Sequence, residues 1–180
     1  MRPLPPLSAA LLLAVLAATS AGVAQPAVAQ TTAPAADTAQ ISEQDRQFLM
    51  DDAQGSAYEL AIANLTLHRT SRKDVKAYAA KVVSDHKTYN KALQELAASK
   101  GVTLSTAMNA ADQKRYASLD SRLGRTADDT FVKEAIRINA DDKKTSAQEA
   151  SSTTDPDIKA FLSKFAAMDA AHEKMAMALR

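Results

Sequence analysis

The chain has 180 residues, of which 46% are hydrophobic, 24% are charged and 4% are aromatic, and it has no cysteine and no tryptophan. This length predicts one domain, and the scarcity of aromatic residues disfavours a β-sandwich. Five of the six prolines lie at or before Pro34 and only three glycines follow it, so the turn residues that a sheet protein needs are missing. The composition therefore predicts an all-α fold.

The N-terminus predicts export. Arg2 precedes the apolar run Leu7–Ala18, which has the length of the hydrophobic region of a secretory signal and is too short to cross a bilayer. A small-x-small sequence ends at Ala29, so we expect residues 1–29 to be a signal peptide. The mature protein is then expected in the periplasm or outside the cell. Its basic and acidic side chains are equal in number once Arg2 is removed, which argues against a nucleic-acid partner.

The remaining sequence predicts an antiparallel four-helix bundle over residues 42–180. A small, polar stretch without periodicity, residues 30–41, reads as a flexible linker. Ser42, Ser71 and Thr126 are expected N-caps, and Asp155 is a cap followed by proline at the first helical position. The expected long helices are residues 42–69, 72–99, 127–151 and 156–180, with one short helix, residues 107–122, between the second and third.

The spacing of core positions supports a bundle. In two helices the series advances alternately by three and four residues, which is typical of left-handed antiparallel packing. These series are Val75, Ala79, Val82, His86, Tyr89, Leu93 and Leu96, and Ile158, Phe161, Phe165, Met168, His172, Met175 and Leu179. The third long helix is weaker, because its series becomes polar after Ile138, at Asp142 and Thr145. No stretch after the signal approaches 18 consecutive apolar residues, so we expect no membrane span in the mature chain.

Each long helix offers one polar side chain near its middle: Glu59, His86, Asn139 and His172. Residues in the middle of antiparallel helices meet at one level, so these groups are expected to lie together. Asp169 stands three residues before His172, on the same face of its helix. Glu59, His86 and His172, with Asp169 as a further carboxylate, are a candidate single-metal site, because imidazole and carboxylate suit iron, zinc or copper.

A second interpretation competes with the metal site. Buried polar groups are generally hydrogen-bonded, so His86 and Glu59 would simply pair across helices without any cofactor. We favour this structural interpretation at the level of the sequence. With this interpretation we expect the protein to be an exported, non-catalytic envelope or stress-associated module. No nucleophile-base arrangement, phosphate-binding loop or basic-aromatic stripe is evident in the sequence. Whether the protein is an enzyme stays open, with non-enzymatic favoured, and association of copies through alanine-rich outer ridges is a further hypothesis.

Several short motifs point to a known family. They are Asp45-x-x-Phe48, Gly55-x-x-x-Glu59-Leu60, Val75-Lys76-Ala77-Tyr78-Ala79 before Asp85-His86, Leu93-x-x-Leu96-Ala97 before Gly101-Val102, Asp157-x-Lys159-x-Phe161, and His172. With these the chain resembles a family of exported bacterial proteins of unknown function, often labelled putative outer-membrane proteins. The resemblance implies a ferritin-like helical bundle. It also implies a further histidine in the third long helix, where this chain has Asn139.

Overall fold

A computed structural model describes residues 41–180. The predicted signal peptide, residues 1–29, and residues 30–40 of the predicted linker lie outside the described residues. The described chain forms five helices, which confirms the predicted all-α fold with one short helix between the second and third long ones. They are α1 (Glu43–Arg69), α2 (Lys73–Ser99), α3 (Ala110–Asp120), α4 (Gly124–Ser152) and α5 (Pro156–Met177).

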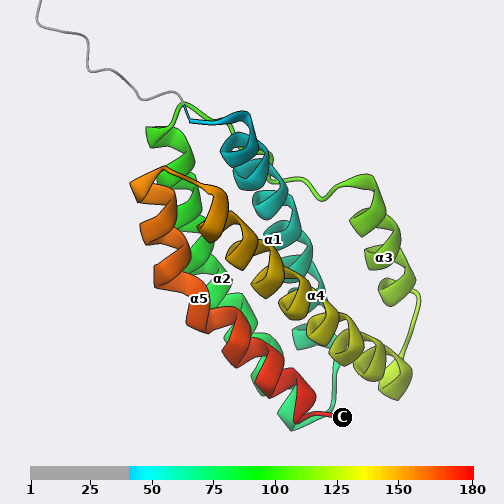
Figure 1. Cartoon of the computed structure of the whole chain (residues 1–180). Coiled ribbons are helices and arrows are strands. Elements are labelled where there is room, and N and C mark those ends of the chain that lie inside the picture. The colour runs from blue at the N-terminus through cyan, green and yellow to red at the C-terminus, as the bar shows by residue number, and fades with distance from the viewer. Residues whose placement is uncertain (1–40) are drawn as a thin grey trace, which may run out of the picture. The chain divides into compact units, whose positions relative to one another are not determined.

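The four long helices form a closed antiparallel bundle (Figure 1). Each packs against two neighbours, in the order α1, α2, α5, α4 and back to α1, while the short α3 lies outside the bundle against α1 and α4. Among the described helices, none is both long and apolar enough to cross a membrane.

The helix ends follow the predicted caps in two cases. Ser42 Oγ accepts a hydrogen bond from the backbone N–H of Asp45 at 3.0 Å, and Asp155 caps α5 through the N–H groups of Asp157 and Ile158. Pro156 fills the first position of α5, where no backbone donor is needed. Gly101 has a φ of 67° and ends the α2 region in the left-handed conformation that glycine tolerates.

Two predicted caps are wrong. The N-cap of α2 is Arg72 rather than Ser71, because the carboxylate of Asp74 accepts the nearby N–H of Val75 and so satisfies a donor of the first turn from within the helix. Thr126 lies inside α4, which begins at Gly124. Gly124 has a φ of 55°, and the helix begins there, three residues earlier than the cap pattern predicted.

Two apolar clusters fill the bundle, and a polar layer separates them. One cluster includes Tyr58, Ile62 and Phe131, and the other includes Leu49, Leu93 and Ile158. Helix α4 contributes to the first cluster only. Its second half is polar, as the weak series after Ile138 indicated, and this leaves an open groove beside α1.

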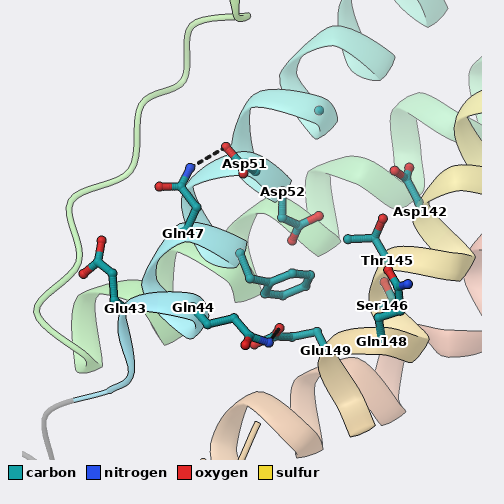
Figure 2. A pocket seen from close by; sticks show the side chains of 12 residues that line it. Glu43, Gln44, Gln47, Asp51, Asp52, Asp142, Thr145, Ser146, Gln148 and Glu149 are labelled. Carbon is teal, nitrogen blue, oxygen red and sulfur yellow. Dashed lines mark hydrogen bonds between the residues drawn. The ribbon is translucent and has the colours of Figure 1, made fainter. Parts of the chain in front are cut away.

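This groove is the acidic cleft, with a volume of about 600 Å³ (Figure 2). Side chains of α1 and α4 form its opposite walls, and Asp52 and Asp142 both extend into the space between the two helices. Its lining includes Glu43, Asp51, Asp52, Asp142 and Glu149. Because α4 places small polar residues where a bundle normally buries large apolar ones, a cleft remains between α1 and this half of α4.

Candidate metal centre

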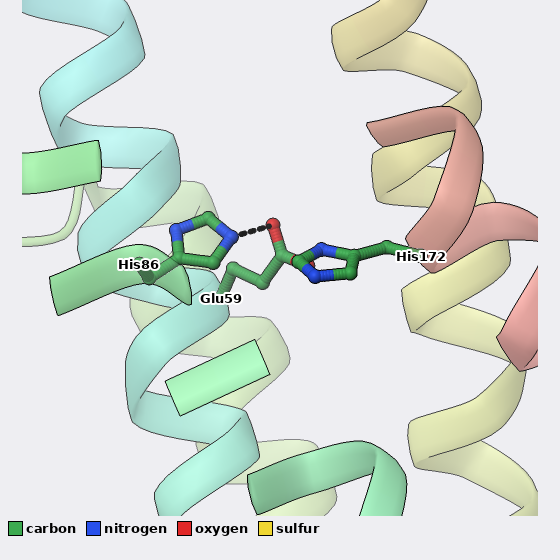
Figure 3. A group of neighbouring side chains, drawn as sticks. All are labelled: Glu59, His86 and His172. Carbon is green, nitrogen blue, oxygen red and sulfur yellow. Dashed lines mark ion pairs between the residues drawn. The ribbon is translucent and has the colours of Figure 1, made fainter. Parts of the chain in front are cut away.

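The polar layer brings together one side chain from each long helix, as predicted. Glu59, His86, Asn139 and His172 are all at most 3% exposed to solvent. Candidate ligand atoms of Glu59, His86 and His172 lie within 4.8 Å of one another. Figure 3 shows the carboxylate of Glu59 between the two imidazole rings, which stack with 5.9 Å between centroids and 24° between planes. The three side chains thus converge on one point of the core.

His86 is held by a partner on each ring nitrogen. Its Nδ1 lies 2.8 Å from Ser56 Oγ, and Ser56 donates its single hydroxyl hydrogen to Asn90 Oδ1 at 2.5 Å. Ser56 therefore accepts from Nδ1–H, which leaves Nε2 facing Glu59. The separation of His86 Nε2 from Glu59 Oε2 is 3.1 Å, which is an ion-pair distance, although the alignment is not that of a hydrogen bond.

His172 is oriented from the other side. Its Nε2 lies 2.8 Å from Asp85 Oδ2, so the carboxylate of Asp85 accepts from Nε2–H. The buried Nδ1 has no hydrogen-bond partner among the described residues. Asp85 also pairs with Lys81 one turn away, and this cation fixes the carboxylate against His172. One nitrogen of each imidazole is therefore bound by an outer group, and the other is the candidate metal ligand.

Asn139 completes the layer as a partner of the carboxylate. Its Nδ2 donates to Glu59 Oε1 at 3.2 Å and to the backbone oxygen of Ala135 at 2.8 Å. The amide thus holds Glu59 in place from α4. The family resemblance implied a histidine here; this chain instead has a donor that orients the carboxylate.

Burial and charge oppose each other at this centre. Burial alone would raise the pKa of Glu59, but the positive charge of His86 lowers it below its ordinary value. Burial would likewise lower the pKa of His86, but the charge of Glu59 raises it. Each partner therefore favours the charged form of the other, and a metal ion bound between them would compete with a proton for His86 Nε2.

Asp169 does not join this group. It is half-buried and lies one helical turn from His172, in a second layer with Asp52 and Asp142. Burial, followed by repulsion from neighbouring carboxylates, raises the pKa of all three groups. The pKa is about 6 for Asp52, about 7 for Asp169 and about 9 for Asp142. The hydrogen bond from the hydroxyl of Tyr89 partly offsets the effect of burial on Asp52. The spacing of Asp169 and His172 placed them on one face, but α5 directs the carboxylate toward this neighbouring layer.

Other predicted positions fall as follows. Met175 was predicted to be a core residue of the last helix, but its side chain is 38% exposed. Ala176 is buried instead, because the buried face of α5 shifts by one residue near the end of the helix. His68 lies on the surface. The outer partners Ser56 and Asp85 were not predicted as such; Ser56 stands on the core face of α1, where a lone hydroxyl among apolar residues was the available signal.

Comparison with known proteins identifies the family and a similar fold, and neither match carries an assigned function. The family described as "Domain of unknown function (DUF4142)" matches residues 30–179. Comparison with curated proteins found no match. A crystal structure of a DUF305 fragment from Deinococcus radiodurans superposes with a TM-score of 0.69 at 13% identity, covering 77% of this chain and 96% of that one. At this identity the likeness concerns the helical fold alone.

Proposed function

The chain belongs to the DUF4142 family, and we propose that it binds one transition-metal ion between Glu59, His86 and His172 in the core of its helical bundle. One observation carries the proposal. Each histidine has one ring nitrogen bound to an outer partner, and its other nitrogen is buried. His172 Nδ1 has no hydrogen-bond partner among the described residues, and His86 Nε2 faces Glu59 Oε2 at 3.1 Å. An unsatisfied buried polar atom is costly, and a metal ion would give His172 Nδ1 a partner while also binding His86 Nε2 and Glu59.

The donor set indicates the class of metal. Two imidazole nitrogens and one carboxylate oxygen suit zinc, iron(II) or copper(II), and are a poor match for calcium or magnesium, which prefer oxygen ligands. The outer partners support the same interpretation. Metal-binding histidines usually donate their second N–H to a carboxylate, hydroxyl or carbonyl oxygen, as Asp85 and Ser56 accept it here.

The competing interpretation is a purely structural polar layer. It accounts for the pairing of Glu59 with His86 and Asn139. It offers no partner for His172 Nδ1, which a single polar contact would have satisfied. Ligand geometry therefore favours the metal, and thermal unfolding separates the two interpretations.

We expect zinc, iron(II) or copper(II) to raise the melting temperature of the metal-free protein. At a free metal concentration 100 times Kd the gain is about 2.7 kcal/mol, which corresponds to roughly 5–10 °C for a domain of this size. His172→Gln removes a ligand while keeping a polar side chain, and should abolish the shift. His68→Leu, which removes the surface histidine, should keep it.

Calorimetric titration of the same proteins gives the stoichiometry, expected to be one ion per chain. A wild-type melting temperature that none of the three metals moves would contradict the proposal. An equal shift in wild type and His172→Gln would show that the metal binds elsewhere.

We also propose that the protein is exported. The apolar run Leu7–Ala18 and the small-x-small sequence ending at Ala29 support secretion of a mature chain that starts at Gln30. Such a protein would bind metal in the periplasm or outside the cell, as an envelope-associated module.

Mass spectrometry of the protein recovered from the periplasmic fraction of a bacterial host is expected to show Gln30 as the first residue. A second small-x-small sequence, Gly22-Val23-Ala24, lies just upstream. Ala24→Leu alters only that sequence and should leave the product unchanged. Soluble protein that retains Met1 would contradict the prediction.

A further inference from the structure

A metal ion must pass between the helices to reach the buried centre, and three clefts lie between pairs of long helices. The cleft between α1 and α2 has no charged residue among its lining side chains, and the cleft between α4 and α5 includes two lysines. The acidic cleft between α1 and α4 is lined by five carboxylic acids and by no lysine, arginine or histidine. Of these surfaces it alone would attract a cation and hold no competing positive charge.

The inner end of the acidic cleft lies one helical turn from the metal centre. Gly55 lines the cleft on α1, four residues before Glu59, and Asp142 lines it on α4, three residues after Asn139. Glu59 and Asn139 are themselves joined by a hydrogen bond. The contact between these two side chains therefore lies one helical turn beyond the residues that line the cleft.

Gly55 keeps this inner end open. A Cβ atom built at Gly55 would meet nothing within 4 Å. A glycine in the middle of a helix lowers helix stability relative to alanine by roughly 0.5–1 kcal/mol, and here no crowding requires it. The missing side chain leaves space directly beside the turn that carries Glu59.

The carboxylic acids that line the cleft supply the attraction. Among residues 41–180, Asp142 has no ion-pair partner, and the hydrogen bond that Asp52 accepts comes from the neutral hydroxyl of Tyr89 at 2.6 Å. Within the described chain, the one group of three or more potential ligands that lies within 4.8 Å is Glu59, His86 and His172. The second-layer carboxylates are thus too far apart to hold an ion together, and suit its passage.

We propose that the acidic cleft is the entrance through which a divalent transition-metal cation reaches Glu59, His86 and His172, passing between Gly55 and Asp142. The inference rests on the proposed metal centre. A hydrated cation is drawn in by the carboxylates and then exchanges water for Glu59 and the two imidazoles. Glu59 lies one helical turn after Gly55 on α1, so we expect it to be the first protein ligand met.

Stopped-flow mixing of the metal-free protein with Co²⁺, followed by its ligand-field absorbance, measures association, and release is measured with excess EDTA. Gly55→Leu narrows the entrance without touching a ligand, so association and release should both slow by about tenfold or more while Kd changes little. Gly55→Ala is the matched control and should keep both rates near those of wild type. Thr145→Leu, on the opposite wall, is a second obstruction should Gly55→Leu fold poorly.

Asp52→Asn tests the charge at pH 7.5, because this side chain lines the cleft and has a pKa of about 6, so it is ionised there. Its association rate should fall by roughly tenfold at low salt and depend less on ionic strength than that of wild type. Co²⁺ binding by wild type with unaltered rates in Gly55→Leu and Thr145→Leu would overturn the entrance and leave the metal centre standing. No uptake of Co²⁺ by wild type would overturn the metal centre and the entrance with it.

Discussion

Replacing His86 with leucine in the metal-free protein is expected to lower the free energy of unfolding by about 3–5 kcal/mol, as for removal of one partner from a buried ion pair. Leucine fits the volume of the site, so the loss does not come from a cavity. Its source is Glu59, which is 2% exposed and would keep a buried negative charge with only the amide of Asn139 as a partner. Urea unfolding followed by circular dichroism at pH 7.5 measures the effect.

A second substitution at Glu59 separates charge from packing. In the double variant Glu59→Leu, His86→Leu the buried charge and its partner are both gone. We expect the double variant to recover to within about 1–2 kcal/mol of wild type, because apolar residues replace buried ion pairs at little cost. The coupling energy from the double-mutant cycle measures the pair itself. A single His86→Leu variant that loses less than about 1 kcal/mol would show that Glu59 is not held ionised in the core.

The stability of the metal-free protein is expected to fall as the pH rises from about 5 to 9. Asp52, Asp169 and Asp142 have pKa values of about 6, 7 and 9 in the folded chain, against an ordinary value of 3.8. The folded state therefore keeps protons that the unfolded chain has already released, and stability declines as each group ionises in the fold. The contribution of His86, whose pKa is raised, is likewise lost at higher pH, whereas that of Glu59, whose pKa is lowered, is lost only in acid.

Asp142→Asn should flatten this profile. The variant cannot acquire the charge whose burial is unfavourable, so it is expected to be more stable than wild type by about 1–3 kcal/mol near pH 9, where water in the open cleft limits the effect. Asp51→Asn, an exposed carboxylate of the same cleft, is the control and should keep the wild-type slope. Melting temperatures between pH 5 and 9 in the presence of EDTA test both variants, and a wild-type midpoint that rises toward pH 9 would contradict the prediction.

The spacing of residues along each helix was enough to predict which side chains meet in the polar layer. Alternating steps of three and four residues place His86 and His172 on buried faces, and antiparallel helices of similar length must bring their middles to one level. The meeting of Glu59, His86, Asn139 and His172 therefore follows from positions in the sequence. Which side chains complete the site depends on the rotation of each helix, and this is why Asp85 rather than Asp169 contacts His172.

The sequence by itself determined the number, type and order of the helices. It also identified the caps at Ser42 and Asp155, and the loss of apolar character in α4 after Ile138. Only the tertiary structure decided the tautomer of each histidine, the role of Asn139 as a donor to Glu59, and the raised pKa of Asp142. The physical reason is that helix formation and burial depend on the periodicity of one segment, whereas hydrogen-bond partners and desolvation depend on groups brought from other helices to within a few ångströms.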